Sequence, residues 1–190
     1  MTLTITMLPT KTLREPSRSL TKEEILSPQI QSLIKDMIPA MYENDGIGLA
    51  APQVGENIRL CIIGQDALYK DERPEIKSTH NLKNKDLVLI NPVFQKLSKK
   101  FTKDDEGCLS VPGYYGEVKR HQEIYVTALD SKGEKIEFAA KNFFARVIQH
   151  EIDHLAGHLF IDRAPDLFHG DHKKKLPVDV VLGGVRKIEK

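Results

Sequence analysis

The residues best suited to chemistry are two histidines four positions apart with a glutamate beside the first. They are His150, Glu151 and His154, in the order His-Glu-Ile-Asp-His. On a helix, positions i and i+4 share one face and lie about 6 Å apart along the axis. Two imidazoles so placed can reach one metal ion, and the adjacent carboxylate can act on a water molecule at that metal. The spacing therefore predicts a metal site with Glu151 as an acid–base group.

A catalytic metal ion needs a third protein ligand. The extended pattern H-E-x-x-H-x-x-G-x-x-H fails, because Phe160 occupies its last position. A later glutamate is absent as well, since none occurs between Glu151 and Glu189. Upstream, the segment Glu-Gly-Cys-Leu-Ser (106–110) offers a thiolate, which binds Zn(II) or Fe(II) well. Cys108 is thus the candidate third ligand, although a cysteine also suits a small buried position.

A third block of interest is the small-residue run Gly-Ile-Gly-Leu-Ala-Ala-Pro-Gln at 46–53. A glycine-rich segment by itself usually forms a structural turn. This one lacks the spacing and the preceding strand of a dinucleotide-binding motif. Its small side chains would let a substrate backbone approach closely. Gln53 could then donate a neutral N–H to an oxyanion that develops during reaction.

Taken together, these blocks resemble the signature motifs of a known family. GIGLAAPQ (46–53), EGCLS (106–110) and QHEIDH (149–154), in this order, are similar to the three motifs of peptide deformylase. The resemblance extends from about Ile5 to Arg163. It implies an α+β fold in which antiparallel sheets surround the helix that carries the histidines. It also implies removal of the formyl group from the N-terminal formyl-methionine of new polypeptides, with release of formate.

The resemblance implies specific roles at the site. Three residues would bind one divalent metal ion, with water as the fourth ligand: Cys108, His150 and His154. The ion is expected to be Fe(II), with Zn(II), Ni(II) or Co(II) as substitutes. Glu151 would act as general base and then as general acid. Gln53 and the backbone N–H of Leu109 would stabilise the oxyanion.

The substrate is expected to bind as an extended strand along residues 46–48 and the segment after Cys108. The expected substrate contacts are Ile47, Gly48, Glu106, Gly107, Phe143, Arg146 and Val147. The last three precede His150 by seven, four and three positions and so share its helix face. Phe143 and Val147 suit either a methionyl side chain or plain core. Arg146 closes the rim of the pocket, binds a peptide carboxylate or carbonyl, or forms a structural ion pair.

Three further residues are candidates for supporting roles at the site. Asp153 and Asp105 are candidate acceptors for the outer N–H of a ligating histidine. Asp153 would alternatively be a surface charge or a partner of Arg163. Tyr115 stands near the position where some family members place a substrate-contacting arginine.

The elements that must position these residues follow from hydrophobic periodicity. A helix is predicted within 22–43, starting near Ser27-Pro28, with Pro39 kinking or ending it. A second helix is predicted over 142–157, with Asn142 as N-cap and Gly157 as its stop. The predicted strands cover 58–64, 87–94 (stopped at Asn91-Pro92) and the hairpin 123–129 with 134–139, and 65–86 is predicted as a surface loop. This content favours an α+β fold.

Length and composition limit the possible classes of protein. The chain has 190 residues, with 28 Lys+Arg against 27 Asp+Glu and a net charge of +1, which argues against a general nucleic-acid binder. No apolar run approaches the ~18 residues of a membrane span, and two cysteines make no disulfide scaffold. The N-terminal residues lack signal-peptide features, so we expect a cytoplasmic protein. We also expect a monomer. We expect one catalytic domain over residues 1–165 and an irregular basic tail over 166–190.

Several alternatives remain open at this point. The same helix could serve a metallopeptidase, or a closed structural metal site in a non-catalytic binding module. A deformylase-like enzyme could also act on a different acyl group. The basic tail, with its run of lysines at 173–175, is a candidate for ribosomal RNA contact, although such runs are usually only solvated.

Overall fold

Two antiparallel sheets and the helix between them form the structure, a computed structural model that describes residues 3–69, 76–78, 85–170 and 172–176. The five-stranded sheet has the order β1 (Gly48–Ala50), β2 (Leu60–Ile63), β3 (Leu87–Lys96), β6 (Glu123–Leu129), β7 (Lys135–Lys141). The four-stranded sheet has the order β4 (Phe101–Cys108), β5 (Val111–His121), β8 (Leu167–His169), β9 (His172–Leu176). The predicted α+β class is confirmed.

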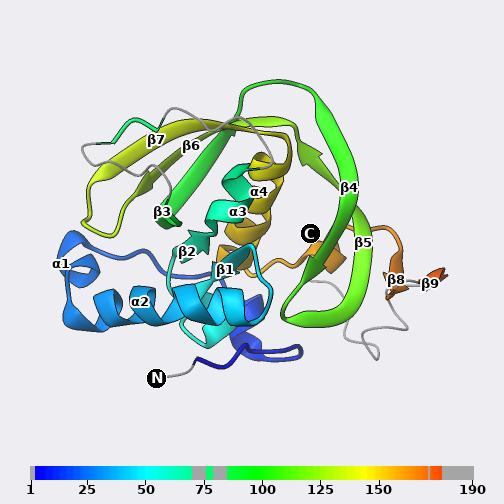
Figure 1. Cartoon of the computed structure of the whole chain (residues 1–190), viewed down its shortest axis with the longest axis horizontal. Helices are drawn as coiled ribbons and strands as arrows, with labels where there is room; N and C mark the ends of the chain where they lie inside the picture. Colours follow the sequence, from blue (N-terminus) through cyan, green and yellow to red (C-terminus); the bar gives the residue numbers. More distant parts are fainter. Residues whose placement is uncertain (1–2, 70–75, 79–84, 171, 177–190) are drawn as a thin grey trace.

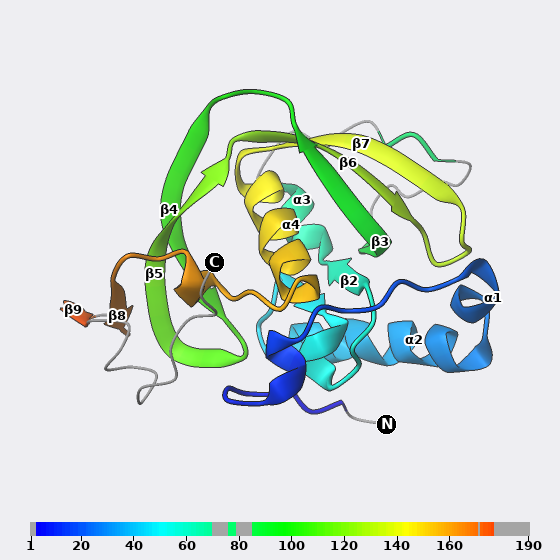
Figure 2. The same ribbon diagram turned by 180° about the vertical axis from the view of Figure 1, so that it is seen from behind.

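Helices surround and fill this frame. The α-helices are α1 (Lys22–Ile25), α2 (Pro28–Glu43), α3 (Gln65–Tyr69) and α4 (Asn142–Leu155), and the 3-10 turns are η1 (Lys11–Arg14), η2 (Ala51–Val54) and η3 (Phe160–Asp162). Helix α4 stands in the centre, with strands β3, β6 and β7 of the five-stranded sheet arching over it and the β4–β5 hairpin to one side (Figures 1 and 2). None of the helices within the described residues is long and apolar enough to cross a membrane.

The apolar faces of these elements form three packed clusters. In the largest, Phe144 and Ile148 of α4 pack with the inner face of β6 and β7, represented by Val126 and Phe138. A second cluster joins α2 to β1 and β2, and a third joins β5 to η3. Burial of apolar area on this scale is the main stabilising contribution to a fold. It fixes α4, and therefore its histidines, between the two sheets.

Helix α2 begins where its sequence signals predict. The Ser27 side chain accepts a hydrogen bond from the N–H of Ile30 at 3.4 Å, and Pro28 is the first helical residue. Pro39 lies inside the helix, which continues to Glu43, so the proline does not end it. The buried face of the helix, which includes Met37 and Met41 around the proline, packs into the second cluster and holds the last turn in place.

The strand predicted over 87–94 does not stop at Asn91-Pro92. Strand β3 continues to Lys96, with a register shift between Ile90 and Val93 against β6. Asn91 adopts the left-handed region at φ 51°, which asparagine tolerates. Its side chain donates to the carbonyl of Leu20 and accepts from the N–H of Leu20, at 2.8 and 3.0 Å. These bonds stabilise a β-bulge where proline alone would interrupt the ladder.

Other local predictions have mixed outcomes. The hairpin of β6 and β7 is confirmed, and α4 ends before Gly157, which has φ +75°. Asn142 is not the N-cap: it is the first residue of α4, at φ 49°, and Lys141 precedes it without a capping side chain. Residues 65–86 begin with the short helix α3, and 70–75 and 79–84 lie outside the described residues.

The basic tail is more regular than expected. Strand β8 pairs with β5 through Tyr114–His169 and Tyr115–Phe168, and β9 pairs with β8. Leu167 is fully buried in the third cluster. Residues 177–190 lie outside the described residues. The domain boundary at residue 165 stays a prediction.

Candidate active site

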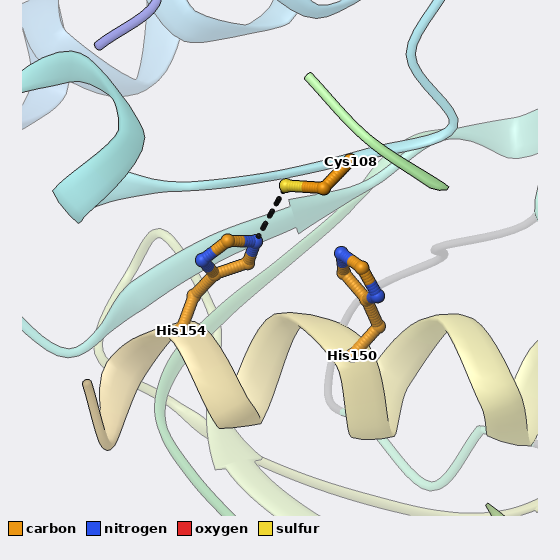
Figure 3. Close-up of side chains that lie close together, drawn as sticks. All are labelled: Cys108, His150 and His154. Carbon is orange, nitrogen blue, oxygen red and sulfur yellow. Dashed lines mark hydrogen bonds between the residues drawn. The ribbon is translucent and has the colours of Figure 1, made fainter. Parts of the chain in front are cut away.

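Three chain segments that are distant in sequence meet at one cavity. Its volume is about 520 Å³, and its lining includes Gln53 of η2, Cys108 of β4, and His150 and Glu151 of α4. One ligand atom from each of Cys108, His150 and His154 lies within 4.8 Å of the others, and Sγ of Cys108 is 3.3 Å from Nε2 of His154. Figure 3 shows the thiol above the two imidazoles, which rise from successive turns of α4. This donor set suits a divalent transition metal ion.

Local structure accounts for the position of the thiol. Cys108 ends β4 at a register shift, where it pairs with Val111 at the start of β5. The preceding residue is held to glycine by packing, since a Cβ on Gly107 would lie 2.7 Å from Cε1 of Tyr115. The tight turn points the cysteine back toward α4, while the tyrosine ring covers the glycine from the neighbouring strand.

The outer nitrogen of His150 is held by Glu106. Nδ1 of His150 lies 3.0 Å from Oε2 of Glu106, which leaves Nε2 to face Cys108. Neither Asp153 nor Asp105 takes this place: Asp153 pairs with Arg120 and Arg163, and Asp105 is exposed. The predicted alternative for Asp153, an ion pair with Arg163, is confirmed.

Burial and neighbouring charges perturb both members of this pair. Burial raises the pKa of Glu106, but Arg120 and His150 outweigh it and bring that pKa well below its usual range. Burial lowers the pKa of His150, but Cys108 and Glu106 outweigh it and raise that pKa. Burial lowers the pKa of His154, which has no such partner at Nδ1 among the described residues. Glu106 therefore stays ionised beside His150.

Glu151 presents a buried carboxylate to the cavity. The side chain packs against Gly48 of β1, where a Cβ would lie 2.3 Å from Oε1. Burial raises the pKa of Glu151 to about 7. Oε2 is buried and has no hydrogen-bond partner within the described part of the chain. Buried carboxylate oxygens are seldom left without partners, so this atom fits a site for water at a metal ion.

Gln53 is oriented by the backbone of its own turn. Its Oε1 accepts the N–H of Ala50 at 2.9 Å. Nε2 must therefore point the other way, where it lies 3.5 Å from Sγ of Cys108 and donates to Oγ of Ser110 at 3.3 Å. Leu109, between Cys108 and Ser110 in the chain, also lines the cavity. Its side chain packs against the second core cluster. An amide N–H is thus held beside the thiol, inside the cavity.

Comparison with known proteins decides the family. A family model described as polypeptide deformylase matches residues 2–168. The chain belongs to the polypeptide deformylase family. Deformylases are metal-dependent hydrolases that act on formylated nascent peptides, and membership places this chain in that class of enzyme. The expected family and fold are confirmed.

Several relatives show how far the likeness extends. Peptide deformylase 1 of a Nostoc species is 40% identical over 153 residues, which is 80% of this chain and 74% of that protein. A chloroplastic peptide deformylase 1A of Solanum lycopersicum is 39% identical over 169 residues, 87% of this chain but only 61% of its own length. The crystal structure of the Synechococcus elongatus deformylase with actinonin matches with a TM-score of 0.75 and 34% identity, covering 95% of this chain and 86% of that one.

The seven residues expected to contact the deformylase substrate all line the cavity. They differ in what their side chains do. Ile47 is 37% exposed at the edge of the cavity, whereas Val147 is 5% exposed. Glu106 and Arg146 are both buried and bonded to each other, Nη1 of Arg146 lying 2.7 Å from Oε1 of Glu106. Of the roles predicted for Arg146, the structure shows the ion pair.

Sequence reasoning missed Arg120. Its guanidinium makes two bonds to Glu106, from Nε at 2.9 Å and from Nη2 at 2.8 Å, and a third to Asp153. A signal was present, because Arg120 falls in the same alternate register of β5 as Val118, and both are buried. A charged residue at an inward position of a strand needs a buried partner. That partner, Glu106, lies on the neighbouring strand β4, four residues beyond Thr102, the residue that pairs with Arg120.

Proposed function

We propose that this chain hydrolyses the N-formyl amide of N-formylmethionyl peptides, releasing formate and a free amino terminus. The observation that carries the proposal is the convergence of a thiol, two imidazoles and a buried glutamate on one cavity. Three protein ligands leave a position for water, as in catalytic rather than structural metal sites.

Cys108, His150 and His154 would hold one divalent ion, which we propose to be Fe(II), with Zn(II), Ni(II) or Co(II) as substitutes. When bound, such an ion supplies Lewis acidity that acidifies water and polarises a carbonyl group. The thiolate and the neutral imidazoles suit these ions by their softness. Glu106, bonded to Nδ1 of His150, fixes the ring so that Nε2 is the ligating atom.

Glu151 acts on protons. Its carboxylate lies in the cavity wall next to Gly48, with Oε2 directed to no protein donor among the described residues. From there it takes the proton of the attacking water and later gives it to the leaving amine. The proton that Glu151 takes from water is the proton that the leaving amine needs, so one carboxylate suffices for both transfers.

Gln53 and the backbone N–H of Leu109 stabilise the developing oxyanion. The amide of Gln53 is already oriented by Ala50 and points at the thiol, so it needs no rearrangement during reaction. Preorganised donors of this kind are worth far more in an enclosed site than in water. Ser110, which accepts from the same Nε2, helps to keep the amide in place.

Substrate recognition follows the walls of the cavity. The peptide backbone lies along residues 46–48 on one side and along the segment after Cys108 on the other, and both segments line the cavity. Phe143 and Val147 line the pocket for the methionyl side chain. Ile47 contacts the chain that follows, because it is exposed at the edge.

We further propose that residues 1–165 form the catalytic domain of a cytoplasmic monomer and that the basic tail, 166–190, contacts the ribosome. The chemical case for that contact is the run of lysines at 173–175, because lysines bind phosphate.

Formate release from a formyl-Met peptide tests the activity. The protein is prepared without oxygen and its metal content is counted. We expect release that requires about one metal ion per chain, with acetyl-Met and unformylated peptides left intact. Glu151→Gln should keep the metal and lose at least ~10²-fold in rate.

Other outcomes would select another function. Cleavage of an unformylated peptide indicates a metallopeptidase. Bound metal without any hydrolysis indicates a structural metal site, and acetate released from acetyl-Met peptides without formate from formyl-Met peptides indicates a different acyl substrate. Loss of metal in Glu151→Gln would make Glu151 a ligand rather than the acid–base group.

A further inference from the structure

Arg146 is turned away from the substrate space and into a buried network. Its side chain is 5% exposed, although the residue lines the cavity. Besides Glu106, its guanidinium donates to the carbonyl of Val118 on β5 at 2.9 Å and to the carbonyl and hydroxyl of Thr102 on β4, both at 3.2 Å. These bonds link α4 to both strands of the hairpin that carries Cys108. Both Nη1 and Nη2 of Arg146 are thus bonded within the protein, which leaves no pair of free N–H groups for a peptide carboxylate.

The Glu106 carboxylate is shared between α4 and β5 in an ordered way. Oε1 accepts from Nη1 of Arg146 and from Nε of Arg120. Oε2 accepts from Nη2 of Arg120 and contacts Nδ1 of His150. Arg146 and His150 lie four positions apart on one helix face, so they hold opposite oxygens of a single carboxylate. Rotation of that carboxylate would break bonds to all three residues.

The network continues to the end of α4. Arg120 also bonds Asp153, and Asp153 bonds Arg163. Charges therefore alternate along Arg146, Glu106, Arg120, Asp153 and Arg163, with three cations against two anions. Arg120 alone is shared between both carboxylates, so it cannot hold Glu106 independently of Asp153. Arg146 has no second carboxylate among the described ion pairs.

We propose that Arg146 is a positioning residue that acts through Glu106 on His150. By holding Oε1, it keeps Oε2 on Nδ1 of His150 and so keeps Nε2 of that ring aimed at Cys108 and His154. Groups that orient a ligating histidine in this way typically contribute 10–100-fold to metal retention. The inference rests on the metal site of the proposed function. It assigns to Arg146 a role other than the substrate contact that its helix position suggested.

A double-mutant cycle on metal retention tests the inference. Protein loaded with Zn(II) is mixed with a chromogenic chelator, and the rate of Zn(II) loss is measured for the wild type, Arg146→Met, Glu106→Gln and the double variant. We expect each single change to speed loss by roughly 10–100-fold. In the double variant, Arg146→Met should add little, because its effect passes through Glu106. Two full effects that multiply would overturn the proposal.

Controls separate positioning from folding. Arg59→Met removes another arginine bonded to a backbone carbonyl, that of Pro92, and should leave Zn(II) loss unchanged. Arg146→Lys keeps a cation that can reach Glu106 but not the strand carbonyls as well, so it should restore part of the retention. If Arg146→Met does not fold, Arg146→Lys takes its place in the cycle with Glu106→Gln, where its smaller effect should likewise add little. Equal loss in Arg146→Lys and Arg146→Met would contradict an effect through Glu106.

Peptide kinetics distinguish this inference from the proposed function. If Arg146 contacts the substrate instead, Arg146→Met raises KM for formyl-Met peptides while Zn(II) loss is unchanged, and the inference fails. If the wild type releases formate from no formyl-Met peptide, the proposed function fails. The Zn(II) cycle still tests Arg146 in that case, because it needs no substrate.

Discussion

Gly48 and Glu151 fit together so closely that a methyl group cannot be placed between them. A Cβ on Gly48 would lie 2.3 Å from Oε1 and 2.8 Å from Cδ of the glutamate. The contact is made by β1 at the edge of its sheet and by the second residue of the His150–His154 segment in α4. Because the glutamate is the proposed acid–base group, the absence of a side chain at residue 48 sets where its carboxylate lies.

Gly48→Ala should therefore impair proton transfer more than metal binding. The added methyl group displaces the Glu151 carboxylate from its position, and we expect kcat for formate release to fall by about 10²-fold or more. Metal content should stay near that of the wild type, since the three atoms nearest to the added Cβ all belong to Glu151 and to none of the three ligands. Glu56→Ala, an exposed change on the following turn, is the matched control. Full activity in Gly48→Ala would refute this account.

Gln53→Ala should remove one oxyanion donor. The side chain is 2% exposed and its amide is held by Ala50, so the donor is fixed in place before the reaction. Loss of a single preorganised donor typically costs ~10²–10³ in kcat. We expect a loss in this range with little change in KM, measured by formate release at saturating peptide. A change in KM alone would instead assign Gln53 to ground-state binding.

Tyr42 should titrate unusually late. Burial, followed by the hydrogen bond that its hydroxyl donates to Asp86 at 2.5 Å, raises the pKa of Tyr42 to about 12. Native stability from this group is then fully present below the unfolded pKa of about 10 and is lost as pH rises toward 12. The free energy of unfolding should fall more steeply above about pH 10 in the wild type than in Tyr42→Phe. Parallel curves would show that the hydroxyl contributes nothing in this range.

Sequence patterns predicted best what is local. His150 and His154 are brought together by helical geometry alone, and the β6–β7 hairpin follows from the turn residues of 130–133. Cys108 needed the elimination of other ligands and the family resemblance, because its approach to α4 depends on the curvature of the β4–β5 hairpin. The histidine pair and the hairpin therefore depend on neighbours in the sequence, whereas the position of Cys108 was predictable only through the family motif.

What the sequence could not predict depends on partners far along the chain. Asn91 forms a bulge instead of a strand end because its side chain meets the backbone of Leu20, 71 positions away. On β4 the side chain of Glu106 is buried and meets His150, whereas that of Asp105 is exposed. Arg120 of β5 is also buried and bonds Glu106. Such pairings are set by tertiary packing, which overrides local preference.

Metal binding should stabilise the protein through Cys108 and not through its other cysteine. Protein stripped by a chelator should unfold at a lower temperature, and adding Fe(II) without oxygen, or Zn(II), should raise the midpoint in proportion to the logarithm of free metal. Cys108→Ser should abolish this rise and formate release together. Cys61→Ala is the matched control, because Cys61 is fully buried in the core and makes no part of the ligand group. It should unfold earlier than the wild type with or without metal, yet keep the full metal-dependent rise. A rise that persists in Cys108→Ser would place the metal elsewhere and overturn the three-ligand site.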